Sequence, residues 1–250
     1  MSNAPTSVVF DIGGTLVDET TSMVGECVAV LGQELGEEGA ERFAEGWQQR
    51  FGDVLARVAQ GEAPWEGTEP VRRRILKEVL AEHGLPREGR EYAALRGVGD
   101  RLVPFDDAAR GLDALASVAT IVGLTNTDLA ASSAAGFRAG FRWHALLSTE
   151  FARSFKPRPE AYALVERHLG VDPARSYFVA AHPWDLRAAA ERGYRTVYLP
   201  RPHALQDAEP GEFDHEIQEV GDLLAIVAAP RVISSTHRRR AVAGCEGEAG

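Results

Sequence analysis

The chain has 250 residues, of which 44% are hydrophobic and 26% are charged, and its formal net charge is −10. This composition is ordinary for a globular protein, and the negative charge argues against nucleic acid as a general partner. No apolar run approaches the roughly 20 residues of a membrane span, so no contact with a membrane is expected. Because the N-terminus also lacks the pattern of a signal peptide, we expect a cytoplasmic protein.

Short apolar runs that end in polar or glycine-rich loops predict the strands of a parallel sheet. These runs are residues 7–11, 118–125, 176–181 and 194–200. Each is apolar almost throughout rather than alternating, as expected of strands covered on both faces. Helical patterns alternate with them, at residues 107–116, 128–139, 158–169 and 185–192. The sequence therefore predicts an α/β fold with a doubly wound, Rossmann-like parallel-sheet core.

The stretch between the first two predicted strands has a different pattern. Residues 20–97 contain no convincing strand and carry apolar residues at helical spacing. Two stretches that contain glycine and proline, 61–67 and 83–89, supply the breaks between helices. An all-helical cap inserted into the core is therefore predicted.

These patterns divide the chain into a core, a cap and a tail. The predicted bounds are 1–18 and 98–229 for the α/β core, 19–97 for the helical cap, and 230–250 for a disordered tail. Within the cap, the aromatic residues Phe43, Trp47 and Phe51 are expected to pack in its interior. The arginine run 72–74 is expected to lie on a solvated helix face.

Polar residues follow several of the predicted strands. In open parallel sheets, ligands bind beyond the carboxyl ends of the strands, so these residues are expected to meet. They are Asp11, Gly13 and Thr15 after the first strand, Thr125 and Asn126 after the second, His182 and Asp185 after the third, and Lys156 in the loop 148–162. A carboxylate surrounded by hydroxyl, amide and lysine groups is suited to covalent catalysis by that carboxylate.

Four motifs resemble motifs I to IV of the haloacid dehalogenase superfamily, in the same order along the chain. They are FDIGGTLVDE, GLTN, KPRPEAY and VAAHPWD, and the predicted helical insert follows the first, where that family has its cap. The resemblance covers about residues 6–228. It implies that Asp11 is a nucleophile that forms an aspartyl ester, which water then hydrolyses, and that Thr15 orients this carboxylate.

The same resemblance gives the other motif residues their expected roles. Thr125 and Asn126 would bind an anionic group of the substrate, helped by the positive end of the helix that follows. Lys156 would lie between Asp11 and Asp185 and keep both carboxylates ionised. The expected partner is a small, anionic substrate molecule, and exposed aromatic residues of the cap would allow a homodimer.

Two departures from the superfamily's phosphatases favour one reaction over another. Gly13 replaces their second aspartate, which protonates the leaving alkoxide, and Ala181 replaces the first of two acidic residues that bind Mg²⁺. Asp11 and Asp185 would be the protein's only carboxylate ligands for that ion. A halide leaves without a proton, so the sequence favours metal-free hydrolytic dehalogenation of a small 2-haloalkanoic acid, with no cofactor. A Mg²⁺-dependent phosphatase acting on a small phosphorylated metabolite, and a non-catalytic metabolite-binding protein, remain as alternatives.

The resemblance to the 2-haloacid dehalogenase (type II) branch is partial. Tyr162 matches a tyrosine of that branch, whereas the branch has tyrosine at the position of Gly13 and asparagine at that of His182. Gln48 stands where the branch has a cap arginine that helps to hold the halide, and Arg42 or Arg50 would be substitutes for it. His182 either positions water over the ester or is an ordinary loop histidine. The predicted substrate-binding residues are Gly13, Gln48, Thr125, Asn126, Tyr162 and His182.

Overall fold

A parallel β-sheet forms the centre of the computed structural model, which describes residues 7–203 and 208–228. The strand order is β5-β4-β1-β6-β7-β8. The strands are β1 (Ser7–Phe10), β4 (Thr120–Thr125), β5 (Ala145–Ser148), β6 (Tyr177–Ala180), β7 (Arg195–Tyr198) and β8 (His215–Glu216), and all pair in parallel. This architecture confirms the predicted doubly wound core. The predicted tail, 230–250, lies outside the described residues.

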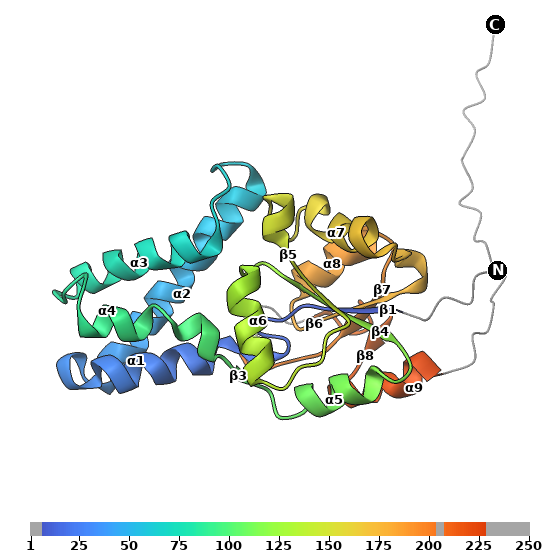
Figure 1. Cartoon of the computed structure of the whole chain (residues 1–250), viewed down its shortest axis with the longest axis horizontal. Helices are drawn as coiled ribbons and strands as arrows, with labels where there is room; N and C mark the ends of the chain where they lie inside the picture. Colours follow the sequence, from blue (N-terminus) through green and yellow to red (C-terminus); the bar gives the residue numbers. More distant parts are fainter. Residues whose placement is uncertain (1–6, 204–207, 229–250) are drawn as a thin grey trace, which may run out of the picture.

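Helices cover both faces of the sheet (Figure 1). They are α5 (Ala108–Leu115) and α9 (Leu223–Ala228) on one face, and α7 (Pro159–Leu169) and α8 (Pro183–Glu191) on the other. A further helix, α6 (Leu129–Arg138), begins just after β4. Each face therefore buries its own hydrophobic cluster, which explains the unbroken apolar runs of the strands. None of the helices in the described ranges is long and apolar enough to cross a membrane.

Four helices form a separate layer beside the sheet, drawn in blue to green in Figure 1. They are α1 (Glu19–Leu35), α2 (Glu37–Gln60), α3 (Thr68–Glu82) and α4 (Arg90–Leu95), and they share a hydrophobic cluster of their own. A short antiparallel ribbon of β2 (Val17–Asp18) and β3 (Val103–Pro104) joins this helical cap to the core. Four 3₁₀ turns, Val98–Arg101, Thr149–Ala152, Pro173–Arg175 and Val220–Asp222, complete the described elements. The exact domain bounds stay a prediction.

The cap aromatics follow the expected pattern. Phe43 and Trp47 are fully buried in the cap's hydrophobic cluster, and Phe51 packs against it while partly exposed. Interior packing is therefore confirmed for Phe43 and Trp47. Because those two rings are buried, they offer no surface to a second copy, and the homodimer stays a prediction.

The arginine run on α3 differs from the prediction. Arg73 and Arg74 are exposed and pair with Glu69 and Glu66, as expected of a solvated face. Arg72 is buried, so the prediction is wrong for this residue. The reason is helical geometry: Arg72 follows Thr68 by four positions, so both lie on the face of α3 that points into the molecule.

The strand β5 was not predicted. Its four residues, ALLS, lack β-branched side chains, and two of them are half-exposed. Strand propensity and continuous burial, the two signals that identified the other strands, are therefore weak here. The strand ends at Ser148, and Thr149 follows it; both are buried beside the loop that follows β4.

Candidate active site

The site begins where β1 ends, at Asp11. The backbone N–H of Asp11 donates to the carbonyl of Val179, which fixes the end of β1 against β6. The Thr15 hydroxyl donates to Asp11 Oδ2 at 2.7 Å and accepts from the backbone N–H of Ala181 at 3.0 Å. Thr15 therefore links the end of β1 to the end of β6 and orients the Asp11 carboxylate. Between them, Gly14 has a φ of 72°, a conformation that glycine adopts without strain.

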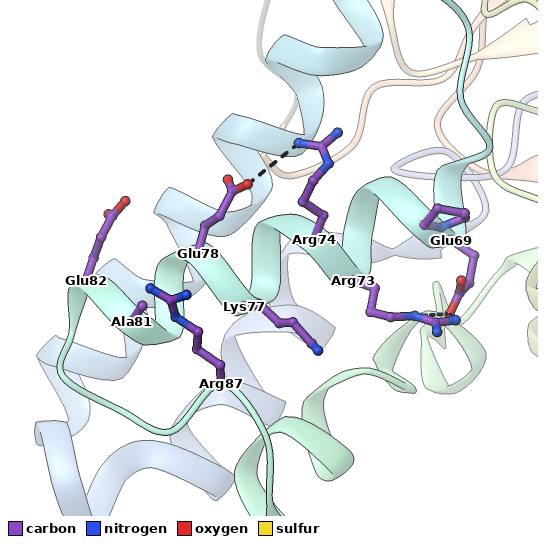
Figure 2. A pocket seen from close by; sticks show the side chains of 9 residues that line it. Glu69, Arg73, Arg74, Lys77, Glu78, Ala81, Glu82 and Arg87 are labelled. Carbon is purple, nitrogen blue, oxygen red and sulfur yellow. Dashed lines mark hydrogen bonds and ion pairs between the residues drawn. The ribbon is translucent and has the colours of Figure 1, made fainter.

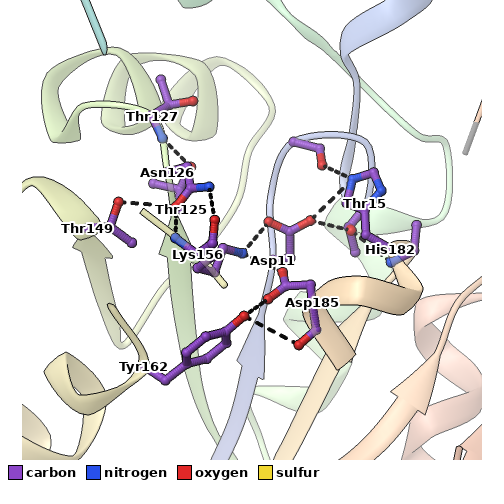
Figure 3. A network of polar contacts seen from close by, with 12 residues as sticks. Asp11, Thr15, Thr125, Asn126, Thr127, Thr149, Lys156, Tyr162, His182 and Asp185 are labelled. Atoms are coloured by element: carbon purple, nitrogen blue, oxygen red, sulfur yellow. Dashed lines mark hydrogen bonds and ion pairs between the residues drawn. The ribbon is translucent and has the colours of Figure 1, made fainter. Parts of the chain in front are cut away.

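Lys156 lies between two carboxylates from different strand ends (Figure 3). Its Nζ donates to Asp11 Oδ1 at 2.7 Å and to Asp185 Oδ2 at 2.6 Å. The Lys156 side chain is 1% exposed and that of Asp185 is 0% exposed, so these charges meet away from water. The hydroxyl of Tyr162, on α7, donates to the other Asp185 oxygen at 2.5 Å. The structure thus places Lys156 between Asp11 and Asp185, as the motifs predicted, and adds Tyr162 as a partner of Asp185.

The buried charges shift one another's protonation. Burial raises the pKa of the Asp11 carboxyl, but the charge of Lys156, with help from His182, outweighs this and leaves that pKa below its usual value. For Asp185, burial prevails over the opposing charge of Lys156, and the nearby Asp11 carboxylate adds to the rise of its pKa. Burial lowers the pKa of Lys156, but the two carboxylates more than reverse this. The arrangement therefore holds Asp11 as the anion, the form that a nucleophile requires.

Asn126 holds the lysine loop in place. Its Oδ1 accepts from the backbone N–H of Lys156 at 2.8 Å and from the hydroxyl of Thr149 at 3.2 Å, and its Nδ2 donates to the Lys156 carbonyl at 3.3 Å. Thr125 accepts from the backbone N–H of Thr127 at 3.1 Å. The expected contact of Thr125 and Asn126 with substrate stays a prediction. Thr149 was missed because the strand that places it, β5, was not predicted.

His182 lies beside the nucleophile. Its Nε2 is 3.0 Å from the Gly13 carbonyl and 3.8 Å from Asp11 Oδ2. A carbonyl only accepts, so Nε2 carries the hydrogen in this contact. The ring stacks on Trp184, with 5.7 Å between centroids and 16° between planes. A Cβ at Gly14 would lie 2.8 Å from Nε2, so this glycine also makes room for the imidazole.

Of the cap residues that were considered for the site, Gln48 lies near the core, whereas Arg42 and Arg50 do not. Gln48 Nε2 lies 3.5 Å from the backbone carbonyl of Glu19, at the start of α1, and so borders the join between cap and core. Arg50 forms a bidentate ion pair with Glu82, and Arg42 is exposed beside Glu38. The prediction that Arg42 or Arg50 supplies a charge to the site is therefore wrong: both point outward and have partners there.

The carboxylates do not fit a magnesium ion. Each of the four oxygens of Asp11 and Asp185 accepts a hydrogen bond, two from Lys156, one from Thr15 and one from Tyr162. The ammonium group thus occupies the position between the carboxylates that a cation ligated by both would need. Among the described residues, no group of three His, Cys, Asp or Glu side chains is placed to hold a metal.

The outer side of α3 carries a separate, open groove of about 760 Å³ (Figure 2). Its lining residues are Glu69, Pro70, Arg73, Arg74, Lys77, Glu78, Ala81, Glu82 and Arg87. Arg73, Arg74 and Lys77 have acidic partners, at Glu69, Glu66 and Glu88. None of the residues at the strand ends lines this groove, so it is not part of the catalytic cluster.

Several known dehalogenases resemble this chain in sequence and in fold. An (S)-2-haloacid dehalogenase of Xanthobacter autotrophicus is 29% identical over 200 residues, which are 78% of this chain and 75% of that protein. An L-2-haloacid dehalogenase structure matches with a TM-score of 0.81 and 28% identity, over 90% of this chain and all of that one. The structure of the L-2-haloacid dehalogenase from Xanthobacter autotrophicus with chloropropionic acid covalently bound matches with a TM-score of 0.74 and 26% identity. The match covers 90% of this chain and 100% of that one. A family model described as haloacid dehalogenase-like hydrolase matches residues 6–193. The chain belongs to the haloacid dehalogenase-like hydrolase family.

Proposed function

We propose that this protein hydrolyses the carbon–halogen bond of a small 2-haloalkanoic acid through an ester on Asp11. The observation that carries the proposal is the bonding of Asp11: it is ionised, buried and held from both sides by Lys156 and Thr15. The named activities of the relatives, which act on the (S) or L enantiomer, make (S)-2-chloropropionate the first substrate to test.

The chemistry proceeds in two steps. An Asp11 oxygen attacks the carbon that bears the halogen, so a carbon–oxygen bond forms while the carbon–halogen bond breaks and halide leaves with the bonding electrons. Water then attacks the carbonyl carbon of the Asp11 ester and the ester carbon–oxygen bond breaks, which releases the 2-hydroxy acid and one proton to solvent and restores the Asp11 carboxylate. His182, next to Gly13 and Asp11, is suited to orient that water.

The residues around Asp11 favour this reaction over phosphate ester hydrolysis. A halide needs no proton to leave, so Gly13, which offers no acid, costs the reaction nothing. The site uses the fixed charge of Lys156 in place of a metal ion, and we infer that catalysis requires no cofactor. Thr125 and the start of α6, where Asp128 caps the helix, are proposed to bind the substrate carboxylate.

Halide release tests the function directly. We expect chloride release from (S)-2-chloropropionate, unchanged by EDTA, with inversion at the reacting carbon and negligible phosphate release from an aryl phosphate. Phosphate release that depends on Mg²⁺, without any halide product, would overturn the proposal.

Oxygen labelling tests the role of Asp11. In a single turnover in ¹⁸O-water with excess enzyme, the product should be unlabelled, because its new oxygen comes from the Asp11 carboxylate. The label should enter Asp11 and reach product only in the next round. Label in the product of the first turnover would mean that water attacks the substrate directly.

A further inference from the structure

Arg72 is the one arginine of residues 19–97, all of which the structure describes, that is buried. Its side chain is 10% exposed, and its Nη2 makes no hydrogen bond to any described group. Buried N–H groups nearly always have partners, because an unpaired one loses its bonds to water without replacement. Arg72 Nη2 can therefore still donate to an acceptor that none of the described side chains supplies.

The guanidinium of Arg72 is held in position by its surroundings. Its Cζ lies 4.6 Å from the centre of the Phe51 ring, a cation–π contact. A Cβ at Gly99 would lie 3.0 Å from Nη1, so a side chain at that position would crowd the guanidinium. The closest carboxylate oxygen is Glu19 Oε1, 3.5 Å from Nη2, a distance that gives attraction but no hydrogen bond.

Glu19 connects Arg72 to the catalytic loop. A Cβ at Gly13 would lie 3.0 Å from Glu19 Oε2, so this carboxylate covers the space that a side chain two residues after Asp11 would fill. One turn before Arg72 on the same face of α3, the Thr68 hydroxyl accepts from the backbone N–H of Asp128 at 2.9 Å. That face of α3 therefore lies over the loop that follows β4.

We propose that Arg72 binds a small monovalent anion of the reaction, and that Glu19 is the counter-ion that this anion displaces. The Glu19 side chain is 31% exposed and makes no hydrogen bond to Arg72, so its carboxylate is free to turn toward water. The anion is either the departing halide or the substrate carboxylate, which share the same charge. The identity of the anion rests on the proposed function. The binding of an anion by Arg72 does not, because it can be measured without turnover.

Chloride binding to the resting protein provides the test. The broadening of the ³⁵Cl NMR line by the protein should fall several-fold in Arg72→Met and stay at the wild-type level in Arg73→Met, a matched control next along the helix. In Glu19→Gln, chloride should bind about five-fold more tightly, the effect of removing an ion pair of about 1 kcal/mol. Glu82→Gln, which removes an exposed carboxylate far from Gly13, should leave chloride binding unchanged.

The two site variants distinguish binding from a structural role. If the Arg72–Glu19 pair only braced the cap, Glu19→Gln and Arg72→Met would weaken chloride binding alike, and that result would overturn the proposal. Equal broadening in Arg72→Met and Arg73→Met would also overturn it. If Arg72→Met does not fold, as judged by circular dichroism, the opposite prediction for Glu19→Gln still decides the question.

Propionate then identifies the anion. Displacement of the chloride by propionate, which lacks a halogen, would assign the substrate carboxylate to Arg72; retention of chloride would assign the halide. Chloride binding by Arg72 in a protein that releases no halide from 2-chloropropionate would support this inference while contradicting the proposed function.

Discussion

Replacing Lys156 by methionine tests the buried charge arrangement most sharply. The substitution keeps much of the side-chain volume but removes two charged hydrogen bonds, of 2.7 Å to Asp11 and 2.6 Å to Asp185. At about 1.5–3 kcal/mol for each bond to a charged group, the loss is about 3–6 kcal/mol. This agrees with the roughly 3–5 kcal/mol that results when one partner of a buried ion pair is removed. We also expect halide release to be abolished.

The destabilisation should depend on pH. In the wild type, Lys156 lowers the pKa of Asp11, so the ionised carboxylate contributes stability above its unfolded pKa, and this is lost as pH falls through the folded value. Without Lys156, its charge no longer opposes the burial of Asp11 and Asp185, so both pKa values rise relative to the wild type. The variant therefore gains relative stability as pH falls and these carboxyls take up protons. The raised pKa of Lys156 itself adds no difference, because its contribution is complete below the unfolded value of about 10.4.

Urea unfolding at about pH 5 and about pH 8 measures this difference. The gap in unfolding free energy between wild type and Lys156→Met should be smaller at the lower pH. Lys77→Met is a matched control, because Lys77 is the only other lysine of the chain and lies at the surface beside Glu88. It should cost less than about 1 kcal/mol. An equal gap at the two pH values, or a loss as small as that of Lys77→Met, would refute the account of the charge cluster.

Two further variants test the packing and bonding around the site. Tyr162→Phe removes the hydroxyl that donates to Asp185, and leaving that buried oxygen without a donor should lower the unfolding free energy by about 1–3 kcal/mol; a neutral effect in urea unfolding would show that water replaces it. Trp47→Ala removes a ring that is 1% exposed in the cap cluster and should cost about 3–5 kcal/mol in thermal unfolding. A loss below about 1 kcal/mol would contradict the buried position of Trp47.

The sequence was sufficient to predict which residues at the strand ends meet. Parallel strands that are buried on both faces give continuous apolar runs, and the polar residues after them must gather at one edge of the sheet. Asp11, Thr15 and Asp185 were found in this way. Lys156 follows no strand directly, and the resemblance to a family was needed to place it between Asp11 and Asp185.

What the sequence did not predict depends on contacts between distant segments. Asn126 bonds the backbone of Lys156 thirty positions away, which no local pattern reveals. Arg72 was assigned to solvent because it stands in a run of three arginines, whereas the cap buries one face of α3 and leaves the others exposed. No sequence pattern pointed to Glu19, because its position over Gly13, where its carboxylate takes the place of a side chain, is a property of the fold.

The charges of the site restrict which substrates it suits. Asp11 and Asp185 share the one ammonium group of Lys156, so these three side chains carry a formal charge of about −1. In the part of the chain that the structure describes, no other lysine or arginine pairs with Asp11. A phosphate monoester brings two negative charges and requires a compensating cation, whereas Lys156 already takes the position between the two carboxylates. A haloacid brings one, and its reacting carbon is neutral until the halide departs. The glycine at position 13 and the lysine at position 156 are therefore consistent with one reaction: displacement of a good leaving group by a carboxylate whose charge a fixed ammonium controls.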